Sequence, residues 1–305
     1  MSQPSLLVLH CPIGGGHRAA ALAIAEAARA ARIEHQVLDA MSLAPPWFGS
    51  AYVAAHLGST EHARWLYGAG FDALDRRGGW ADRLRCALDH GAGAELVRYV
   101  QRCEARRPGL CVVATHFFAL EVLGAARRAG RLGAPLVGVV TDYGAHAYWA
   151  ARGVDAFCVA GEAGADLVRH GIGSPSLHRT GIPVRAAFGR AAPARAGLGW
   201  AGEARRLRAT ETLPLRVLVT CGGFGVGPIG EVVRSFAAAQ AGATLAQGAM
   251  AGARGMPELE LTVVCGDNAA RVREVRDIAR AAGVPARVLG VERDMAARMS
   301  AAEVV

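Results

Sequence analysis

The sequence contains no lysine, so all 34 of its basic side chains other than histidine are arginines. With 26 acidic residues, the formal charge is +8 and the pI is near 9.6, which favours an anionic partner such as a phosphate group or an acidic membrane surface. The arginines are scattered rather than grouped in a stripe, and no nucleic-acid recognition motif occurs. We therefore expect no nucleic-acid partner.

Paired cysteine motifs and long apolar runs are also missing. The seven cysteines include no Cys-x-x-Cys pair, and most lie inside apolar runs, which is typical of reduced thiols and argues against a disulfide framework or a zinc site. No apolar run approaches the roughly 20 residues that a membrane-spanning helix needs, and the N-terminus has no signal-peptide pattern. We expect a cytoplasmic protein that at most lies on the inner face of the cell membrane.

A glycine turn near the N-terminus is the first distinctive feature. The apolar run Leu6–Leu9 predicts a strand, and an alanine-rich segment that runs to about Arg32 predicts a helix. Between them lie Gly14, Gly15 and Gly16, which permit close backbone approach, and the helix N-terminus behind them favours an anion. His17 adds a titratable imidazole to the first turn of this helix, which a purely structural turn does not need.

Two functional interpretations of this turn stay open at this point, beside a tight strand–helix turn with a solvated histidine. Gly14-x-Gly16-x-x-Ala19, with Asp39 at the end of the next apolar run, satisfies the dinucleotide-binding pattern. Alternatively, the turn binds a nucleotide-sugar or its acceptor, and His17 acts as a base. A P-loop is excluded because no Gly-Lys-Ser/Thr follows.

Strand and helix patterns alternate along the chain and predict an α/β protein with parallel sheets. The predicted strands are 34–38, 110–115, 135–141, 155–160, 177–180, 216–221, 259–265 and 286–289, and the predicted helices are 94–106, 119–129, 163–170, 229–239 and 269–282. We interpret residues 1–188 as one domain, 189–214 as a linker and 215–305 as a second domain. Residues 240–257 are predicted to be a loop, and the last residues to open another strand. Both domains begin with strand, glycine turn and helix, which predicts two Rossmann-like modules.

Residues 42–90 interrupt this alternation with aromatic side chains and arginines. Three of the five tryptophans, Trp47, Trp65 and Trp80, lie here. Aromatic rings at the headgroup level and guanidinium groups on anionic lipids are typical of an interfacial membrane segment. A helical subdomain with inward aromatic side chains and solvated arginines explains the same pattern.

Polar residues follow two of the central predicted strands, where open α/β sheets bind ligands. Thr141–Trp149 contains Asp142 and His146, which could form an acid–imidazole pair, and Trp149, which could stack on a sugar or headgroup. A capped turn with a structural histidine is the alternative. His116 follows the neighbouring strand and would line the same crevice as His17. No His-x-x-x-His or cysteine partner indicates a metal.

A second glycine turn, Gly222–Gly227, follows the first strand of the second domain and would hold a diphosphate on its backbone N–H groups. Together with the first domain it completes an ordered set of motifs. The set is Gly14-Gly15-Gly16-His17-Arg18-x-Ala20, Thr115-His116-Phe117, Thr141-Asp142-Tyr143-x-x-His146-x-x-Trp149, Gly181-Ile182-Pro183-Val184 and Gly222-Gly223-x-Gly225-x-Gly227. In this order the motifs resemble the monogalactosyldiacylglycerol synthase and processive diacylglycerol glucosyltransferase family, which is related to MurG-type enzymes.

The resemblance covers nearly the whole chain and implies a GT-B-like fold of two Rossmann-like modules. It implies an inverting glycosyltransferase that moves a hexose from a UDP-sugar to a diacylglycerol-type lipid at an anionic membrane surface, without a metal or other cofactor. His17 would be the base, with Asp142 and His146 assisting it. The implied acceptor residues are Gly14, Gly15, Gly16, His116, Tyr143 and Trp149, and the implied donor residues are Gly222, Gly223, Gly225 and Gly227.

The sequence departs from the family at its C-terminal end. The resembled enzymes continue with a glycine-rich loop and an acidic residue that grips the donor ribose, whereas this sequence ends at Val305. The resemblance therefore implies an incomplete second module, either in a fragment or truncated product or in a chain whose site another chain completes, and it leaves open whether this chain is active alone. The alternatives are an NAD(P)-dependent oxidoreductase that uses Gly14, Gly16, Ala19 and Asp39, or a non-catalytic membrane-binding remnant of a glycosyltransferase.

Overall fold

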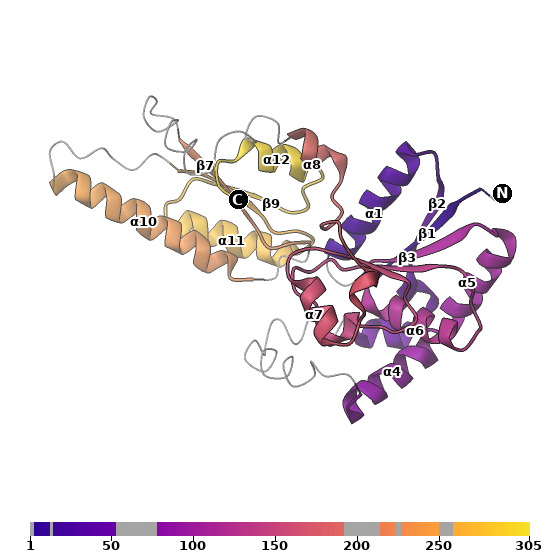
Figure 1. The fold of residues 1–305 in the computed structure, drawn as a ribbon. Helices are drawn as coiled ribbons and strands as arrows, with labels where there is room; N and C mark the ends of the chain where they lie inside the picture. Colours follow the sequence, from indigo (N-terminus) through magenta and orange to yellow (C-terminus); the bar gives the residue numbers. More distant parts are fainter. Residues whose placement is uncertain (1–2, 13–14, 53–77, 192–213, 224–226, 250–258) are drawn as a thin grey trace. The chain divides into compact units, whose positions relative to one another are not determined.

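The computed structural model describes residues 3–12, 15–52, 78–191, 214–223, 227–249 and 259–305. The chain divides into two compact units, residues 1–185 and 186–305 (Figure 1). Residues 192–213, most of the predicted linker, lie outside the described residues, and so do residues 53–77 of the aromatic segment. The first residues of the predicted linker belong instead to a short helix, α8 (Ala186–Ala191).

The N-terminal unit is built on a six-stranded parallel sheet with the order β2-β1-β3-β4-β5-β6. Its strands are β1 (Ser5–His10), β2 (Glu34–Asp39), β3 (Leu110–Ala114), β4 (Leu136–Val139), β5 (Ala156–Val159) and β6 (Leu177–Arg179). Because every strand runs in the same direction, the residues that follow the strands gather at one edge of the sheet. This edge is where ligands bind in open α/β folds.

Helices cover both faces of this sheet. They are α1 (Gly15–Ala30), η1 (Ala40–Leu43), α4 (Trp80–Ala92), α5 (Ala94–Arg106), α6 (Phe117–Arg128), η2 (Ala147–Trp149), α7 (Ala163–Arg169) and η3 (Ser174–Ser176). The inward side of α1 consists of alanines, including the buried Ala20, Ala21 and Ala28. Such small side chains allow a helix to lie close to a sheet, which holds the first turn of α1 near the strand ends.

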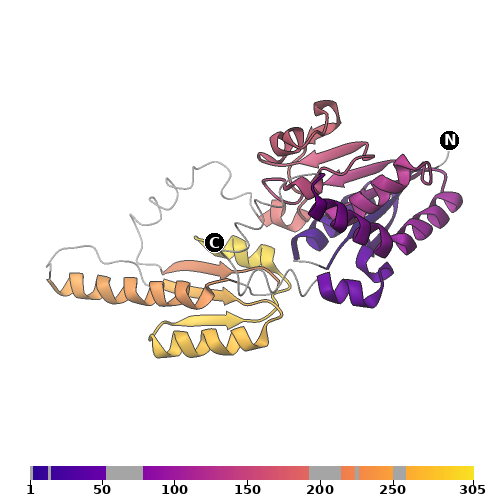
Figure 2. The ribbon, with the colours of Figure 1, turned by 90° about the horizontal axis from the view of Figure 1, so that it is seen from below.

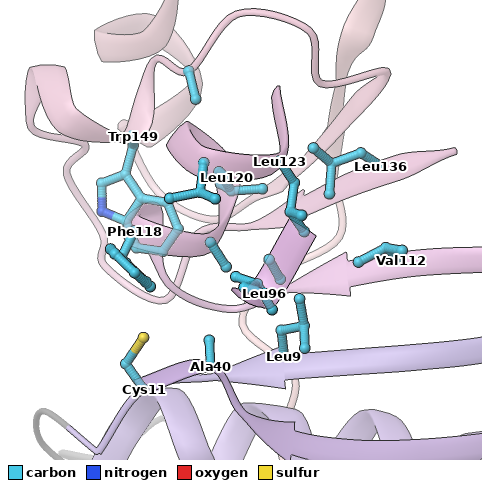
Figure 3. Close-up of a cluster of buried hydrophobic side chains, with 14 of the residues drawn as sticks. Leu9, Cys11, Ala40, Leu96, Val112, Phe118, Leu120, Leu123, Leu136 and Trp149 are labelled. Atoms are coloured by element: carbon cyan, nitrogen blue, oxygen red, sulfur yellow. The ribbon is translucent and has the colours of Figure 1, made fainter. Parts of the chain in front are cut away.

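The largest hydrophobic cluster fills the opposite face of the sheet from α1. Leu9, Val112 and Leu136 come from three neighbouring strands and pack with Phe118 and Leu120 of α6 (Figure 3). Successive strand residues point to opposite faces, so Val8 and His10 belong to the α1 face. The polar residues that continue this α1 face beyond the strand ends form the candidate site.

The C-terminal unit contains a three-stranded parallel sheet with the order β7-β8-β9, whose strands lie side by side in Figure 2. Its elements are β7 (Leu215–Thr220), α10 (Ile229–Ala249), β8 (Leu259–Val264), α11 (Ala269–Ala281), β9 (Ala286–Leu289) and α12 (Met295–Ala301). Val217 and Val263 pack against α10 and α11, whereas Leu218 and Val264 pack against α12. The parallel α/β fold predicted from the sequence is therefore confirmed.

Two predictions in this unit were wrong in detail. The predicted loop 240–257 begins as helix, because α10 continues to Ala249 through residues that include alanine, the strongest helix former. The predicted final strand is preceded by a helix that the sequence reading missed, α12, whose N-cap Asp294 accepts a hydrogen bond from the Ala297 amide. Only Val304 pairs as a strand residue, in a parallel bridge with Val217.

Candidate active site

The candidate site lies at the carboxyl edge of the six-stranded sheet, where β1, β3 and β4 end. In the strand register Leu9 is opposite Ala114, and Ala114 is opposite Gly138. The segments after β3 and β4 therefore lie beside the N-terminus of α1, as the sequence predicted. This proximity brings Thr115 and Thr141 into contact with His17.

His17 is held at one ring nitrogen by two oxygens from different strands. Its Nδ1 lies 2.7 Å from the backbone carbonyl oxygen of Thr115 and 2.8 Å from Oγ1 of Thr141. The Thr115 hydroxyl in turn donates to the backbone carbonyl of His17 at 2.9 Å. The half-buried imidazole is thus fixed to the sheet edge by side-chain and main-chain contacts together.

The contact with Thr115 assigns the proton on the His17 ring. A carbonyl oxygen can only accept a hydrogen bond, so Nδ1 must carry the hydrogen. In the neutral imidazole the lone pair is then on Nε2. A neutral Nε2 is the atom that a histidine base uses to take a proton.

His116 lies behind His17 and is almost completely buried. Its Nδ1 accepts a hydrogen bond from the Phe118 amide at 3.1 Å, so the side chain caps the N-terminus of α6. Its ring lies edge-on to that of His17, with centroids 4.6 Å apart, and stacks on Phe117. At 1% exposure, His116 supports the site from within the core rather than offering a face to a ligand.

Trp149 differs from the expectation that it stacks on a sugar or headgroup. Its side chain is 1% exposed and belongs to the core of the N-terminal unit (Figure 3). Its indole N–H donates to Asp142 at 3.0 Å, and its ring centroid lies 6.2 Å from that of His17. Burial of a large apolar ring stabilises the folded protein, whereas its exposure to water does not. Trp149 therefore forms the floor of the site, and Asp142 anchors it.

The loop between β4 and η2 is fixed by a carboxylate that the sequence reading missed. Asp166 of α7 is buried, accepts a hydrogen bond from the Ala145 amide at 2.7 Å and pairs with Arg169. His146 caps η2, because its Nδ1 accepts from the Tyr148 amide at 3.3 Å. Tyr143 in the same loop is 75% exposed and is available to a ligand. No local pattern identifies Asp166, because its partner lies 21 residues away.

A buried group of charged side chains lies beneath this loop, between α4 and α6. The Arg85 guanidinium donates to Asp89 at 2.6 Å and to Asp82 at 2.8 Å, and it lies 3.7 Å from Glu121. The guanidinium also lies over the Tyr148 ring, whose centroid is 4.3 Å from its carbon atom. One arginine thus faces three buried carboxylates, an arrangement that the sequence reading did not predict.

The carboxylates of this group do not all keep their ordinary acidity. Burial raises the pKa of Asp89 from 3.8 to about 6, the Arg85 charge opposes this rise, and the nearby Glu121 adds to it. His90 contributes a second partner to Glu121, with Nε2 3.2 Å from Oε1. Protonation of Asp89 therefore changes the charge of the group that joins α4 to α6. This group also contacts Tyr148 at the side of the site.

In the C-terminal unit the carboxyl edge is lined by glycine backbone. Gly222 has a φ of +70° and Gly266, after β8, a φ of +63°. A Cβ on Gly266 would lie 2.1 Å from the Gly223 carbonyl oxygen, and the Asp267 amide donates to that oxygen at 2.8 Å. The loops after β7 and β8 therefore touch through their main chains, which only glycine at position 266 permits.

The other predicted site residues are glycines of the two glycine turns and Asp39. Gly227 has a φ of +139°, and Gly15 and Gly16 are exposed at the start of α1, whereas Gly14 and Gly225 lie outside the described residues. The sequence reading missed Gly266, although it follows an apolar strand as Gly222 does. Asp39, the acid of the dinucleotide interpretation, caps η1 by accepting from the Met41 amide at 2.9 Å.

Known structures similar to this chain identify its fold first. A crystal structure of a glycosyltransferase from Rickettsia africae ESF-5 superposes with a TM-score of 0.50 over 99% of this chain and 72% of that chain, at 8% identity. MurG from Acinetobacter baumannii gives 0.48 over 98% and 70%, at 17% identity. No curated protein sequence matches the chain significantly. The fold is that of the GT-B glycosyltransferases.

The family follows from the sequence itself. Residues 17–184, more than half of the 305, match the family described as monogalactosyldiacylglycerol (MGDG) synthase. The chain belongs to this family, and we therefore class it as a glycosyltransferase. The family match begins at His17 and includes the ends of β3 and β4, after which Thr115 and Thr141 contact its ring. This assignment favours the interpretation of the first glycine turn as a nucleotide-sugar or acceptor loop over the dinucleotide interpretation.

Among the described residues, no group of three or more histidine, cysteine, aspartate or glutamate side chains is arranged to hold a metal ion. Within the same residues, no helix combines the length and the apolar character that crossing a bilayer requires.

Proposed function

We propose that this protein transfers a hexose from a UDP-sugar to a hydroxyl group of a diacylglycerol-type lipid, with inversion at the anomeric carbon. The observation that carries the proposal is the state of His17. Its Nδ1–H is bound to the Thr115 carbonyl, which leaves the basic lone pair on Nε2. A base fixed at a ligand-binding sheet edge is what activation of an acceptor hydroxyl requires.

In the proposed reaction, Nε2 of His17 removes the proton of the acceptor hydroxyl as its oxygen attacks the anomeric carbon. The bond between that carbon and the UDP oxygen breaks, and UDP leaves with the electron pair. The resulting negative charge on the diphosphate is stabilised by the N–H groups of the glycine edge in the C-terminal unit, around Gly222 and Gly223. No step in this scheme is assigned to a metal.

The side chains of helix α4 favour a lipid as the acceptor, because the charged ones face inward and two leucines face outward. Asp82, Arg85 and Asp89 face inward, whereas Leu84 and Leu88, one turn apart, are 54% and 50% exposed. Charged residues normally take the exposed side of a helix and leucines the buried side. An apolar stripe on the outside fits contact with acyl chains at a membrane surface, which we propose as the site of action.

The decisive experiment is a transfer assay with the UDP-sugar, diacylglycerol vesicles and three chains: wild type, His17→Ala and His35→Ala. His35 is the matched control, because its Nδ1 also contacts a backbone carbonyl, that of Ile33 at 3.0 Å. Loss of a general base costs about 10²–10⁴-fold in rate, so His17→Ala should lose nearly all transfer and His35→Ala none. Transfer that survives in His17→Ala would overturn the assignment of the base.

Calorimetric titration with UDP tests the donor half separately. A Cβ on Gly223 would meet no described atom within 4 Å, so the Cβ added in Gly223→Val does not clash with the described fold. We expect UDP binding in the wild type, weaker binding in Gly223→Val and none of NAD(P) by either chain. Binding of NAD(P) in place of UDP would favour the oxidoreductase. Vesicle binding without UDP affinity would favour a non-catalytic remnant, and loss of transfer with EDTA would contradict metal independence.

A further inference from the structure

The ring of His17 is restrained by two contacts at one nitrogen, not by a single hydrogen bond. The Thr115 carbonyl and the Thr141 hydroxyl approach the same Nδ1 atom, at 2.7 and 2.8 Å, from the ends of the adjacent strands β3 and β4. Thr115 is completely buried and its hydroxyl lies 2.9 Å from the His17 carbonyl oxygen and 3.2 Å from that of Leu9. Thr115, whose carbonyl contacts the ring, is therefore itself fixed to β1 and to the backbone of His17.

We propose that Thr141 is a positioning residue, whose hydroxyl, with the Thr115 carbonyl, locks His17 in the Nδ1–H tautomer and in one ring orientation. The catalytic consequence of this lock, a lone pair on Nε2 kept towards the acceptor, rests on the proposed function. The lock itself is a property of the folded chain and does not depend on any substrate.

The geometry explains why both oxygens are needed. The carbonyl favours the proton on Nδ1, because it can only accept, and the Thr141 hydroxyl oxygen strengthens this preference as a second acceptor of the same hydrogen. A single contact at Nδ1 still permits the ring to pivot about the line between the two atoms. A second oxygen on another strand, which shares the same hydrogen in a three-centre bond, removes this freedom. Since neither contact is a carboxylate, the lock fixes the ring without placing a negative charge on it.

Other histidines of the same unit provide internal standards. His35 makes the same kind of contact as His17, from Nδ1 to a backbone carbonyl, and should also carry its hydrogen on Nδ1. His116 and His146 accept amide hydrogens at Nδ1, at 3.1 and 3.3 Å, and must carry theirs on Nε2. When its imidazole rings are neutral, the protein should therefore contain histidines of both tautomers at known positions.

The test is a long-range ¹H–¹⁵N correlation spectrum of the full chain labelled in histidine, recorded where the imidazoles are neutral. The signals are assigned by single substitution of each histidine. We expect Nδ1–H patterns for His17 and His35 and Nε2–H patterns for His116 and His146. An Nε2–H pattern for His17 would overturn the proposal.

Two variants then isolate Thr141. Thr141→Val keeps the shape and removes the hydroxyl, and Thr141→Ser restores it. Loss of one hydrogen bond corresponds to a change of about five-fold in population, so Thr141→Val should show a measurable Nε2–H fraction at His17 and Thr141→Ser should not. Unchanged signals of His116 and His146 establish that each variant is folded. A spectrum of His17 that is identical in Thr141→Val and the wild type overturns the proposal.

The kinetic counterpart separates this proposal from the proposed function. If the chain transfers hexose, Thr141→Val should lower kcat about five-fold with KM unchanged, and Thr141→Ser should recover most of the rate. If no transfer is found but the Thr141→Val spectrum changes as expected, the lock stands and the proposed function fails. Transfer by the wild type with full kcat in Thr141→Val overturns the positioning role and leaves the proposed function intact.

Discussion

The guanidinium carbon of Arg85 lies 4.3 Å from the centroid of the Tyr148 ring, so a largely buried charge on α4 contacts the residue that precedes Trp149, whose ring lies near that of His17. The same guanidinium binds Asp82 and Asp89 and lies near Glu121. This relationship ties the stability of the helix pair α4 and α6 to the shape of the site. We therefore expect the loss of stability on replacing an arginine to depend on whether its acidic partners are buried.

Arg85→Met should be among the most destabilising single substitutions in the N-terminal unit. It leaves the buried carboxylates of Asp82 and Asp89 without the arginine that pairs with them, and removal of one partner from a buried pair costs about 3–5 kcal/mol. The control is Arg98→Met, because Arg98 pairs with Glu95 at the surface, where such pairs contribute less than about 1 kcal/mol. Urea unfolding of both variants measures the difference, and equal midpoints would refute it.

The pKa of Asp89 predicts a pH dependence of stability. Because burial raises this pKa from 3.8 to about 6, the folded chain keeps a proton that the unfolded chain has released between these values. The contribution of Asp89 to the free energy of unfolding therefore falls as pH rises from about 4 to 6, by up to about 3 kcal/mol.

Asp89→Asn should remove this part of the pH dependence. The measurement is the unfolding free energy of wild type and variant at several pH values from 4 to 7, with the exposed Asp277→Asn as a control. We expect the wild type and Asp277→Asn to lose stability along parallel curves and Asp89→Asn to follow a flatter one. Parallel curves for all three chains would show that Asp89 titrates normally.

The outward leucines of α4 predict a specific membrane contact. Leu84→Glu combined with Leu88→Glu should reduce binding to phosphatidylglycerol vesicles about ten-fold, because two apolar side chains no longer enter the lipid and two negative charges are added. Val168→Glu on α7, also at an exposed apolar position, is the control for an added charge. Cosedimentation measures both, and equal loss in the control would assign the effect to charge alone.

The contact between Gly266 and Gly223 predicts a site-specific effect in the C-terminal unit. Gly266→Ala and Gly283→Ala impose nearly the same strain, with φ values of +63° and +65°, but only the first drives a Cβ into another main chain. Positive φ alone costs about 1–2 kcal/mol. We expect this strain to lower the stability of both variants by a similar small amount. Gly266→Ala should lose further stability because of the contact. UDP binding should weaken about ten-fold in Gly266→Ala alone.

Calorimetric titration with UDP, combined with thermal unfolding, distinguishes these effects. Weaker UDP binding in Gly283→Ala would indicate that the strain and not the contact between loops matters. Unchanged binding in Gly266→Ala would remove this edge of the sheet from the proposed donor site.

The regular parts of the fold were predictable from local patterns. The helix predicted over residues 94–106 coincides with α5, because its apolar period and its ends are encoded locally. The end of α10 was not, because an alanine- and glycine-rich segment is compatible with both helix and loop. The Arg85 group could not be predicted either, since Arg85 and Glu121 are 36 positions apart and meet only when α4 packs on α6.

The sequence by itself determined that this protein is an α/β glycosyltransferase of the MGDG synthase family, with His17 at the carboxyl edge of a parallel sheet. Strand periodicity, glycine turns and motif order are local properties, and parallel strands must end at one edge. Only the tertiary structure decided which side chains at that edge face outward. Packing buried Trp149 and His116 as supports, and the meeting of β3 with β4 turned Thr115 and Thr141 into the contacts that fix the His17 ring.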